Sequence, residues 1–146
     1  MVFDIATSMQ TIKGHLMASG LFDTVMIGEP KSPPGSGLTA SIFMGRAGIE
    51  ELTLDKTVEL HEVVVRFYTP ELQQPTPIRE DRLEKAVGSI EKAWFGDFTF
   101  GGTIRNIDIA DLVWEFGEIT IGRTEKYRTV EVTLPLIVDG SATLAA

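Results

Sequence analysis

Residues 57–69, TVELHEVVVRFYT, are the stretch of this chain that decides its fold class. They are rich in β-branched and aromatic side chains, which favour a strand over a helix. Three successive valines, Val63 to Val65, put apolar side chains on both faces of such a strand, because neighbouring side chains point in opposite directions. The stretch therefore predicts a long strand at the centre of a sheet.

The sequence before this strand predicts a second strand, a loop and a helix. Apolar residues occupy every second position from Leu38 to Met44, which is the period of a strand, and Gly45 to Asp55 is expected to form an irregular, wide hairpin connection. Prolines and glycines between Gly28 and Gly37 predict an exposed loop after a short strand over Leu21 to Ile27. Asp4 to Gly20 has the pattern of an amphipathic helix. The apolar face of that helix comprises Ile5, Met9, Ile12 and Leu16.

The sequence after the central strand repeats this order. Pro70 to Pro77 interrupts regular structure, and Asp81 to Phe95 follows as a second amphipathic helix. Phe98 to Asp108 is expected to form the start of a hairpin and a strand, and Glu118 to Gly122 pairs with Tyr127 to Val138 as a final antiparallel pair. The apolar stripe of the second helix comprises Leu83, Val87, Ile90 and Trp94.

This order of elements predicts an α+β fold. The expected architecture is an antiparallel or mixed β-sheet with the two amphipathic helices packed on one face. A chain of 146 residues is close to the commonest domain size, so residues 1–146 are expected to form one domain.

The composition narrows the class of protein. Hydrophobic residues make up 43% and charged residues 23%, as in ordinary globular domains. The net charge of −8 repels a phosphate backbone, which disfavours non-specific binding of DNA or RNA. The absence of cysteine excludes disulfides and thiolate metal sites. There is no leader-like N-terminus and no apolar run long enough to cross a bilayer, so a soluble, unexported protein is expected.

Two short motifs resemble binding motifs but lie in the wrong context. Gly35 to Ala40, GSGLTA, has the G-x-G-x-x-A spacing of dinucleotide-binding loops, yet a strand is expected to follow it where those loops need a helix. His61 and Glu62 begin like a zinc-binding H-E-x-x-H helix, but Val65 stands at the second histidine position. His61 is instead expected on the solvated face of its strand and His15 on a helix surface, so no catalytic residue and no cofactor is predicted.

Oxygen ligands are concentrated between Arg105 and Asp111. Asn106, Asp108 and Asp111 are ligand types that hard cations prefer, but the segment lacks the alternating acids and the glycine of a calcium loop. Turn and capping roles account for the same residues, so no metal site is predicted.

Three segments share their order and spacing with a known family. They are Gly20–Ile42, GLFDTVMIGEPKSPPGSGLTASI, Gly96–Ile109, GDFTFGGTIRNIDI, and Lys126–Gly140, KYRTVEVTLPLIVDG. Together they resemble the small tail terminator and tail completion proteins of long-tailed bacteriophages and of prophages of actinobacteria. The similarity follows the overall pattern of nearly the whole chain and contains no sharp chemical motif.

The resemblance implies a structural virion protein and no enzyme. In that family an α+β subunit forms a ring, usually a hexamer, that caps the tail tube, stops its polymerisation and joins it to the head-completion proteins. The implied partners are other copies of the chain, the major tail tube protein and a head-completion protein, with DNA passing through the ring without specific binding. The implied location is the virion tail, assembled in the host cytoplasm.

Two segments are candidate contact surfaces for such an assembly. One is the proline-rich loop from Glu29 to Gly37, and the other is Arg123 to Arg128, a basic strand edge in an acidic chain. The candidate interface residues are Lys31, Pro33, Pro34, Arg123, Lys126, Tyr127 and Arg128.

Two alternatives stay open. A head–tail connector or a minor tail protein would share this composition. A small ligand-binding or enzymatic α+β domain is an alternative of another class, and it would require a deep polar pocket with perturbed ionisable groups.

Overall fold

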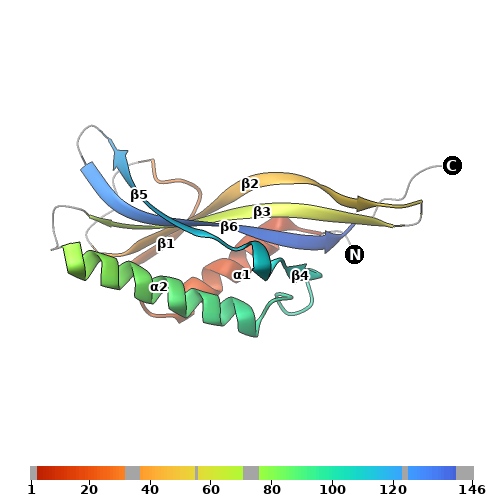
Figure 1. Ribbon diagram of the computed structural model, residues 1–146, viewed down its shortest axis with the longest axis horizontal. Coiled ribbons are helices and arrows are strands. Elements are labelled where there is room, and N and C mark those ends of the chain that lie inside the picture. Colours follow the sequence, from red (N-terminus) through yellow and green to blue (C-terminus); the bar gives the residue numbers. More distant parts are fainter. Residues whose placement is uncertain (1–2, 32–36, 55, 71–75, 123–124, 141–146) are drawn as a thin grey trace.

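The computed structural model describes residues 3–31, 37–54, 56–70, 76–122 and 125–140, with the backbone alone for residues 76–79. This part of the chain forms helices and a mixed sheet, which confirms the predicted α+β class (Figure 1). The elements in chain order are α1 (Ile5–Ala18), β1 (Thr24–Ile27), β2 (Thr39–Leu52), β3 (Thr57–Pro70), α2 (Thr76–Gly96), β4 (Asn106–Ile107), η1 (Ile109–Asp111), β5 (Trp114–Ile121) and β6 (Glu125–Asp139).

The strand that starts at Thr57 is central, as its composition predicts. β3 lies between β2 and β6, in the order β1-β2-β3-β6-β4, and β5 pairs with β6 beside this path. Val63, Val64 and Val65 are all buried, so both faces of β3 are covered at this point. Only the β1–β2 pair is parallel, which makes the described sheet mixed.

The prediction of an irregular connection from Gly45 to Asp55 is wrong for most of its length. β2 continues to Leu52 and pairs with β3 almost to the turn, but its register shifts between Met44 and Ala47 and again between Ile49 and Glu51. Each shift puts an extra residue into β2 and breaks the alternation of apolar and polar positions. A search for alternating apolar and polar residues therefore could not predict this part of β2.

The last antiparallel pair is confirmed, and β6 contains a proline just beyond it. β5 pairs with β6 from Trp114 to Ile121. Pro135 lies where β6 changes its neighbour from β5 to β4, and its carbonyl accepts the Asp108 N–H at 3.0 Å on that side. In an antiparallel strand the N and the C=O of one residue point to the same side. The nitrogen of Pro135 therefore points to the side of β4 and β5, so its missing N–H costs no hydrogen bond to β3.

Both helices contribute to one hydrophobic core with the sheet. Their apolar stripes pack with the odd-numbered residues of β3, such as Val65 and Phe67, and with the even-numbered residues of β6. The stripes include Met9, Ile12 and Leu16 from α1 and Leu83, Ala86, Ile90 and Trp94 from α2. Trp94 stacks on Trp114 with 5.8 Å between the ring centroids. The core therefore connects α2 directly to the base of β5.

The segment after α2 contains much less strand than Phe98 to Asp108 predicted. Turns occupy residues 97–103, and within Phe98 to Asp108 only Asn106 and Ile107 form a strand with β6. Gly101 and Gly102 have φ angles of 66° and 89°, and Phe100 has 49°, so this backbone is left-handed and cannot continue a strand.

A polar contact joins α1 to this turn. The Nε2 atom of His15 lies 3.0 Å from Oδ2 of Asp97, and the other carboxylate oxygen of Asp97 accepts the Gly101 N–H at 2.8 Å. The His15 side chain is only 18% exposed. The expectation that His15 lies on a helix surface is therefore wrong, because the turn after α2 covers it.

The Asp97→Asn substitution is expected to lower the free energy of unfolding by about 1–2 kcal/mol, because it weakens two hydrogen bonds made by a partly buried carboxylate. Urea unfolding followed by circular dichroism measures this loss. The matched control is Asp81→Asn, which removes an exposed ion pair to Lys85 and should change stability by less than about 0.5 kcal/mol. Equal effects of the two substitutions would contradict a structural role for the His15–Asp97 contact.

Candidate interaction surfaces

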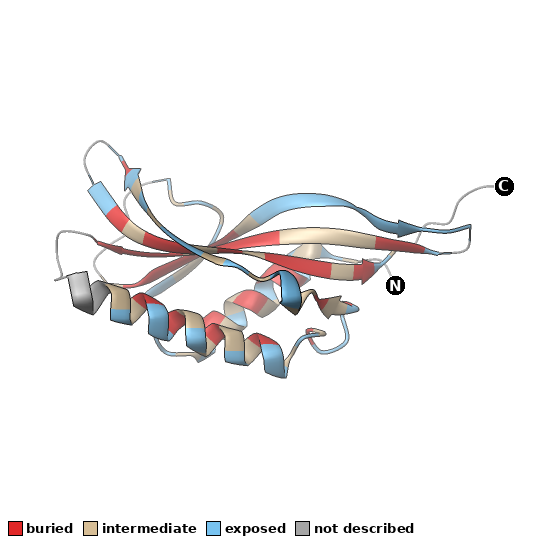
Figure 2. Cartoon of the chain, viewed as in Figure 1, coloured by how far each residue is buried: buried red, intermediate tan, exposed pale blue. Residues whose placement is uncertain are grey.

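The most exposed apolar part of the sheet is the hairpin formed by β2 and β3. We call residues 45–54 and 56–62 the arm. Figure 1 shows that the arm extends past the helices, and Figure 2 shows that most of its β2 half is exposed. Its exposed apolar residues, together with the adjoining Met44, are Met44, Ile49, Leu52 and Leu54.

Met44, Ile49 and Leu52 share one face of the sheet. Met44 lies opposite Val63, which belongs to the core, and Ile49 and Leu52 lie opposite Glu59 and Thr57 on the same strand. Val63, Glu59 and Thr57 share a face because they are separated by even numbers of residues. The face of the sheet that covers the core therefore continues into the arm, where its apolar side chains are exposed to solvent.

The charged side chains of the β2 half of the arm are arranged differently from the apolar ones. Arg46 donates to Oε1 of Glu62 at 2.6 Å, although its own side chain is 82% exposed, and this pairing raises the pKa of Arg46. Glu51 lies opposite Val58, on the face that carries Glu62. Glu50 and Glu51 are both exposed, and neither has an ion-pair partner within the described part of the chain. The β2 half of the arm thus presents one cation and two acids that have no ion-pair partner among the described residues.

A second unpaired edge lies on the other side of the sheet. β5 pairs with β6 in a regular register over its whole length, and no strand pairs with its outer side among the residues described. Val113 and Phe116 are exposed there. Unpaired edges are templates for strand addition unless charges, prolines or bulges block them.

The proline-rich loop is described only at its ends. Lys31 is exposed, while Pro33 and Pro34 lie outside the described residues. Gly37 has a φ of 94°, and a Cβ atom at this position would lie 1.9 Å from Oδ2 of Asp23, which accepts the Leu38 N–H. Gly37 is therefore needed for this close approach. The strand β2 that follows confirms that the glycine-rich motif lacks the helix of a dinucleotide-binding loop.

The basic segment Arg123 to Arg128 is not a strand edge where it is described. Arg123 lies outside the described residues, and Tyr127 pairs with Pro70 of β3 on one side and Ile119 of β5 on the other. The prediction of a strand edge is wrong here, because β5 pairs with β6 as far as Glu125 and covers this side of it. Lys126 remains exposed at the end of the β5–β6 pair.

Tyr127 and Arg128 are already engaged within the chain. Tyr127 is 3% exposed, its ring meets that of Tyr68, and burial and the charge of Glu125 raise its pKa. Arg128 donates to Oε1 of Glu80 at 2.8 Å and to the Gly117 carbonyl at 3.1 Å. Both residues therefore make contacts within the chain. Of the described interface candidates, Lys31 and Lys126 are exposed to solvent.

A partly buried charge cluster lies on the face of the sheet opposite the core. Arg66 donates to Oε2 of Glu131 at 2.6 Å and to the Tyr68 hydroxyl at 3.2 Å, and that hydroxyl also accepts from Ser41. Burial lowers the pKa of Arg66, but its contacts with Tyr68 and Glu131 outweigh this and raise it. All four polar groups are satisfied, which indicates a structural network.

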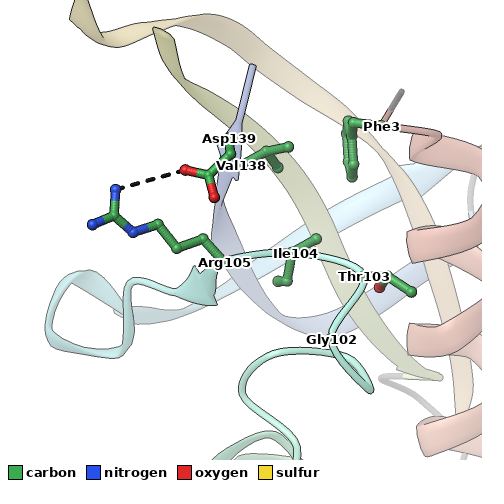
Figure 3. Close-up of a pocket in the computed structure, with 7 residues that line it drawn as sticks. All are labelled: Phe3, Gly102, Thr103, Ile104, Arg105, Val138 and Asp139. Atoms are coloured by element: carbon green, nitrogen blue, oxygen red, sulfur yellow. Dashed lines mark ion pairs between the residues drawn. The ribbon is translucent and has the colours of Figure 1, made fainter. Parts of the chain in front are cut away.

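A hollow of about 240 Å³ lies at the C-terminal end of β6, where Val138 and Asp139 line it. Figure 3 shows Arg105 and Asp139 paired on one side of it, with Phe3 on the other. The two charged groups lie 3.8 Å apart and are well exposed, and the Thr103 hydroxyl in its wall donates to the Phe100 carbonyl. This hollow is smaller than the roughly 300–1,000 Å³ typical of ligand pockets.

Of the oxygen ligands between Asn106 and Asp111, Asp108 and Asp111 lie together, and Asn106 does not join them. Asp108 and Asp111 share a hydrogen bond, which raises the pKa of Asp108 together with burial and the charges of Asp111 and Glu50. Asn106 instead donates from Nδ2 to the Ile107 carbonyl. Within the described ranges, no group of three or more His, Asp or Glu side chains is placed to hold a metal ion.

His61 lies on the core face and not on a solvated one. Its register partner is Leu136 of the core, its ring packs on Phe3 at 4.6 Å, and Nε2 lies 3.0 Å from Oε1 of Glu59. The solvated-face prediction for His61 failed because the N-terminal segment covers this part of β3. Phe3 lies too far from His61 in sequence for a pattern to reveal the contact.

Comparison of the sequence with protein-family models and with curated proteins gives no match. Neither α1 nor α2, over its described residues, is both long and apolar enough to cross a membrane.

Proposed function

We propose that this chain is a structural subunit that works by associating with other copies of itself, as a ring-forming tail terminator of a long-tailed phage. The observation that carries the proposal is the arm, whose core face presents Met44, Ile49 and Leu52 to solvent. Contiguous exposed apolar side chains typically mark association surfaces. The resemblance of the sequence to tail terminator proteins supplies the specific role.

The two unpaired edges support a ring. The β2 edge in the arm and the β5 edge lie on opposite sides of the described sheet, so the two cannot meet within one chain. A contact between different surfaces of neighbouring copies is heterologous, and it closes into a ring when the rotation between copies divides a full turn. We also propose that both helices pack on one face of the sheet, leaving the edges and the arm free for neighbours.

In this role the subunit caps the tail tube and stops its growth. Its partners are the major tail tube protein and a head-completion protein, and the virion tail is its location. The net charge of −8 suits a ring through which DNA slides, because like charge opposes binding by counterion release.

A catalytic role receives less support from the geometry. Three hollows lined by described residues have volumes of about 190–240 Å³, and their ionisable groups are paired with one another or exposed. No constellation of nucleophile, base and orienting group is placed at any of them.

The proposal is tested by light scattering and negative-stain electron microscopy of the purified chain, alone and with tail tubes. We expect rings of one defined subunit number, and antibody labelling at the head-proximal end of the tail. Labelling at the distal end would point to a minor tail protein. A chain that stays monomeric even with tail tubes would contradict the proposal.

A further inference from the structure

The outer edge of β2 from Met44 to Leu52, which we call the arm edge, has a sequence that complements itself. The edge reads MGRAGIEEL, with Gly48 at its centre. In an antiparallel pair of two such edges, residues at equal distances from Gly48 become neighbours. The neighbours are then Met44 with Leu52, Arg46 with Glu50, and Ala47 with Ile49.

We propose that two copies of this chain pair through their arm edges, antiparallel about a two-fold axis at Gly48. The pairing places apolar side chains against apolar ones on the core face. It also places Arg46 of each copy beside Glu50 and Glu51 of the second copy. The contact is isologous, so it closes as a dimer and cannot propagate.

The charges of the arm edge make a second copy the fitting occupant. Arg46 is exposed although it touches Glu62, so it can reach an acid across an interface without leaving a buried site. Neither Glu50 nor Glu51 makes an ion pair among the described residues. Opposite charges across neighbouring strands attract and like charges repel, so the charges of the edge match those of its own antiparallel copy.

The irregularities of β2 are compatible with this symmetry. Its two register shifts lie on either side of Gly48, between Met44 and Ala47 and between Ile49 and Glu51. A two-fold axis at Gly48 therefore brings the first shift of one copy against the second shift of the other. A Cβ atom on Gly48 would meet nothing within 4 Å, so this part of the edge is open to close approach by a second backbone.

The dimer would keep the apolar face of the arm covered before assembly. The dimer would then be the form of the subunit before it enters a ring. This role rests on the proposed ring function, because the dimer has to dissociate before the arm can contact a neighbour in the ring. The dimer itself does not depend on that function.

The test uses two charge-reversed variants of the full chain, Arg46→Glu and Glu50→Arg/Glu51→Arg, studied by sedimentation equilibrium. We expect the wild-type chain to dimerise and each variant alone to dimerise at least about 10-fold more weakly, because like charges then face each other twice. An equimolar mixture of the two variants should recover the dimer, because every reversed charge meets its opposite.

Two controls separate this contact from other effects. Glu62→Gln removes the intrachain partner of Arg46 and should leave dimerisation unchanged, and circular dichroism should show that each variant is folded. Dimerisation that survives either reversal, or a mixture that stays monomeric, would overturn the inference. Rings that form normally from both variants would leave the proposed function standing while the two-fold contact fails.

Discussion

Trp94→Ala is expected to lower the free energy of unfolding by about 3–5 kcal/mol, the usual loss for a large aromatic side chain removed from a core. Trp94 is fully buried and belongs to the main core cluster. Its ring stacks on that of Trp114 with an angle of 8° between the planes, so the substitution also removes an aromatic pair. The cavity left behind would lie between α2 and the base of β5.

Urea unfolding followed by circular dichroism measures this loss without relying on tryptophan fluorescence. Phe95→Ala is the matched control, because Phe95 is the next residue of α2 and is 51% exposed. That control should change stability by less than about 0.5 kcal/mol. A loss below about 1 kcal/mol for Trp94→Ala would show that α2 does not close the core as described.

The substitution Trp94→Phe measures the energetic effect of the indole N–H separately from that of the ring. The Nε1 atom of Trp94 is buried and has no hydrogen-bond partner among the described residues. Trp94→Phe removes this unpaired N–H and keeps an aromatic ring, so its cost should be much smaller than that of alanine.

The core of this fold was predictable from local sequence patterns. The valines of β3 and most of the stripes of α1 and α2 are buried as the periods of a strand and of a helix require. Ile5 and Val87 of the predicted stripes are only partly buried and pack against the edge of the core. The start of α2 was missed, because Pro77 was interpreted as a break. The helix in fact begins at Thr76, and a proline is tolerated in the first turn, where its missing N–H has no helical partner.

The arm was not predictable in the same way. Met44, Ala47, Ile49 and Leu52 share one face, but their spacings of three, two and three residues match neither a strand nor a helix. Only the register with β3 reveals the two inserted residues. The interface residues in Arg123 to Arg128 were predicted from their charge. Charge alone could not show that Arg128 binds Glu80 and the Gly117 carbonyl within the same chain.

The double substitution Ile49→Lys/Leu52→Lys is expected to weaken self-association of the chain roughly 100-fold or more, because buried apolar anchors carry most of the energy of an interface. Both side chains lie on the core face of the arm and are 63% and 48% exposed in the single chain. Lysines on an edge strand also block strand addition directly. Sedimentation equilibrium measures the association, and electron microscopy shows whether rings still form.

The fold should tolerate these lysines, because both positions are exposed and neither belongs to the core cluster. The matched control is Met17→Lys/Leu21→Lys, which changes two apolar residues of similar exposure near the end of α1. Association that is weakened equally by the control would mean that general surface charge, and not the arm, governs assembly. Lysines in the arm oppose any partner that covers its apolar face, whereas the charge reversals at Arg46 and at Glu50 and Glu51 affect the two-fold contact selectively. Loss of rings with the lysines but not with the reversals would therefore assign the arm to a neighbour in the ring.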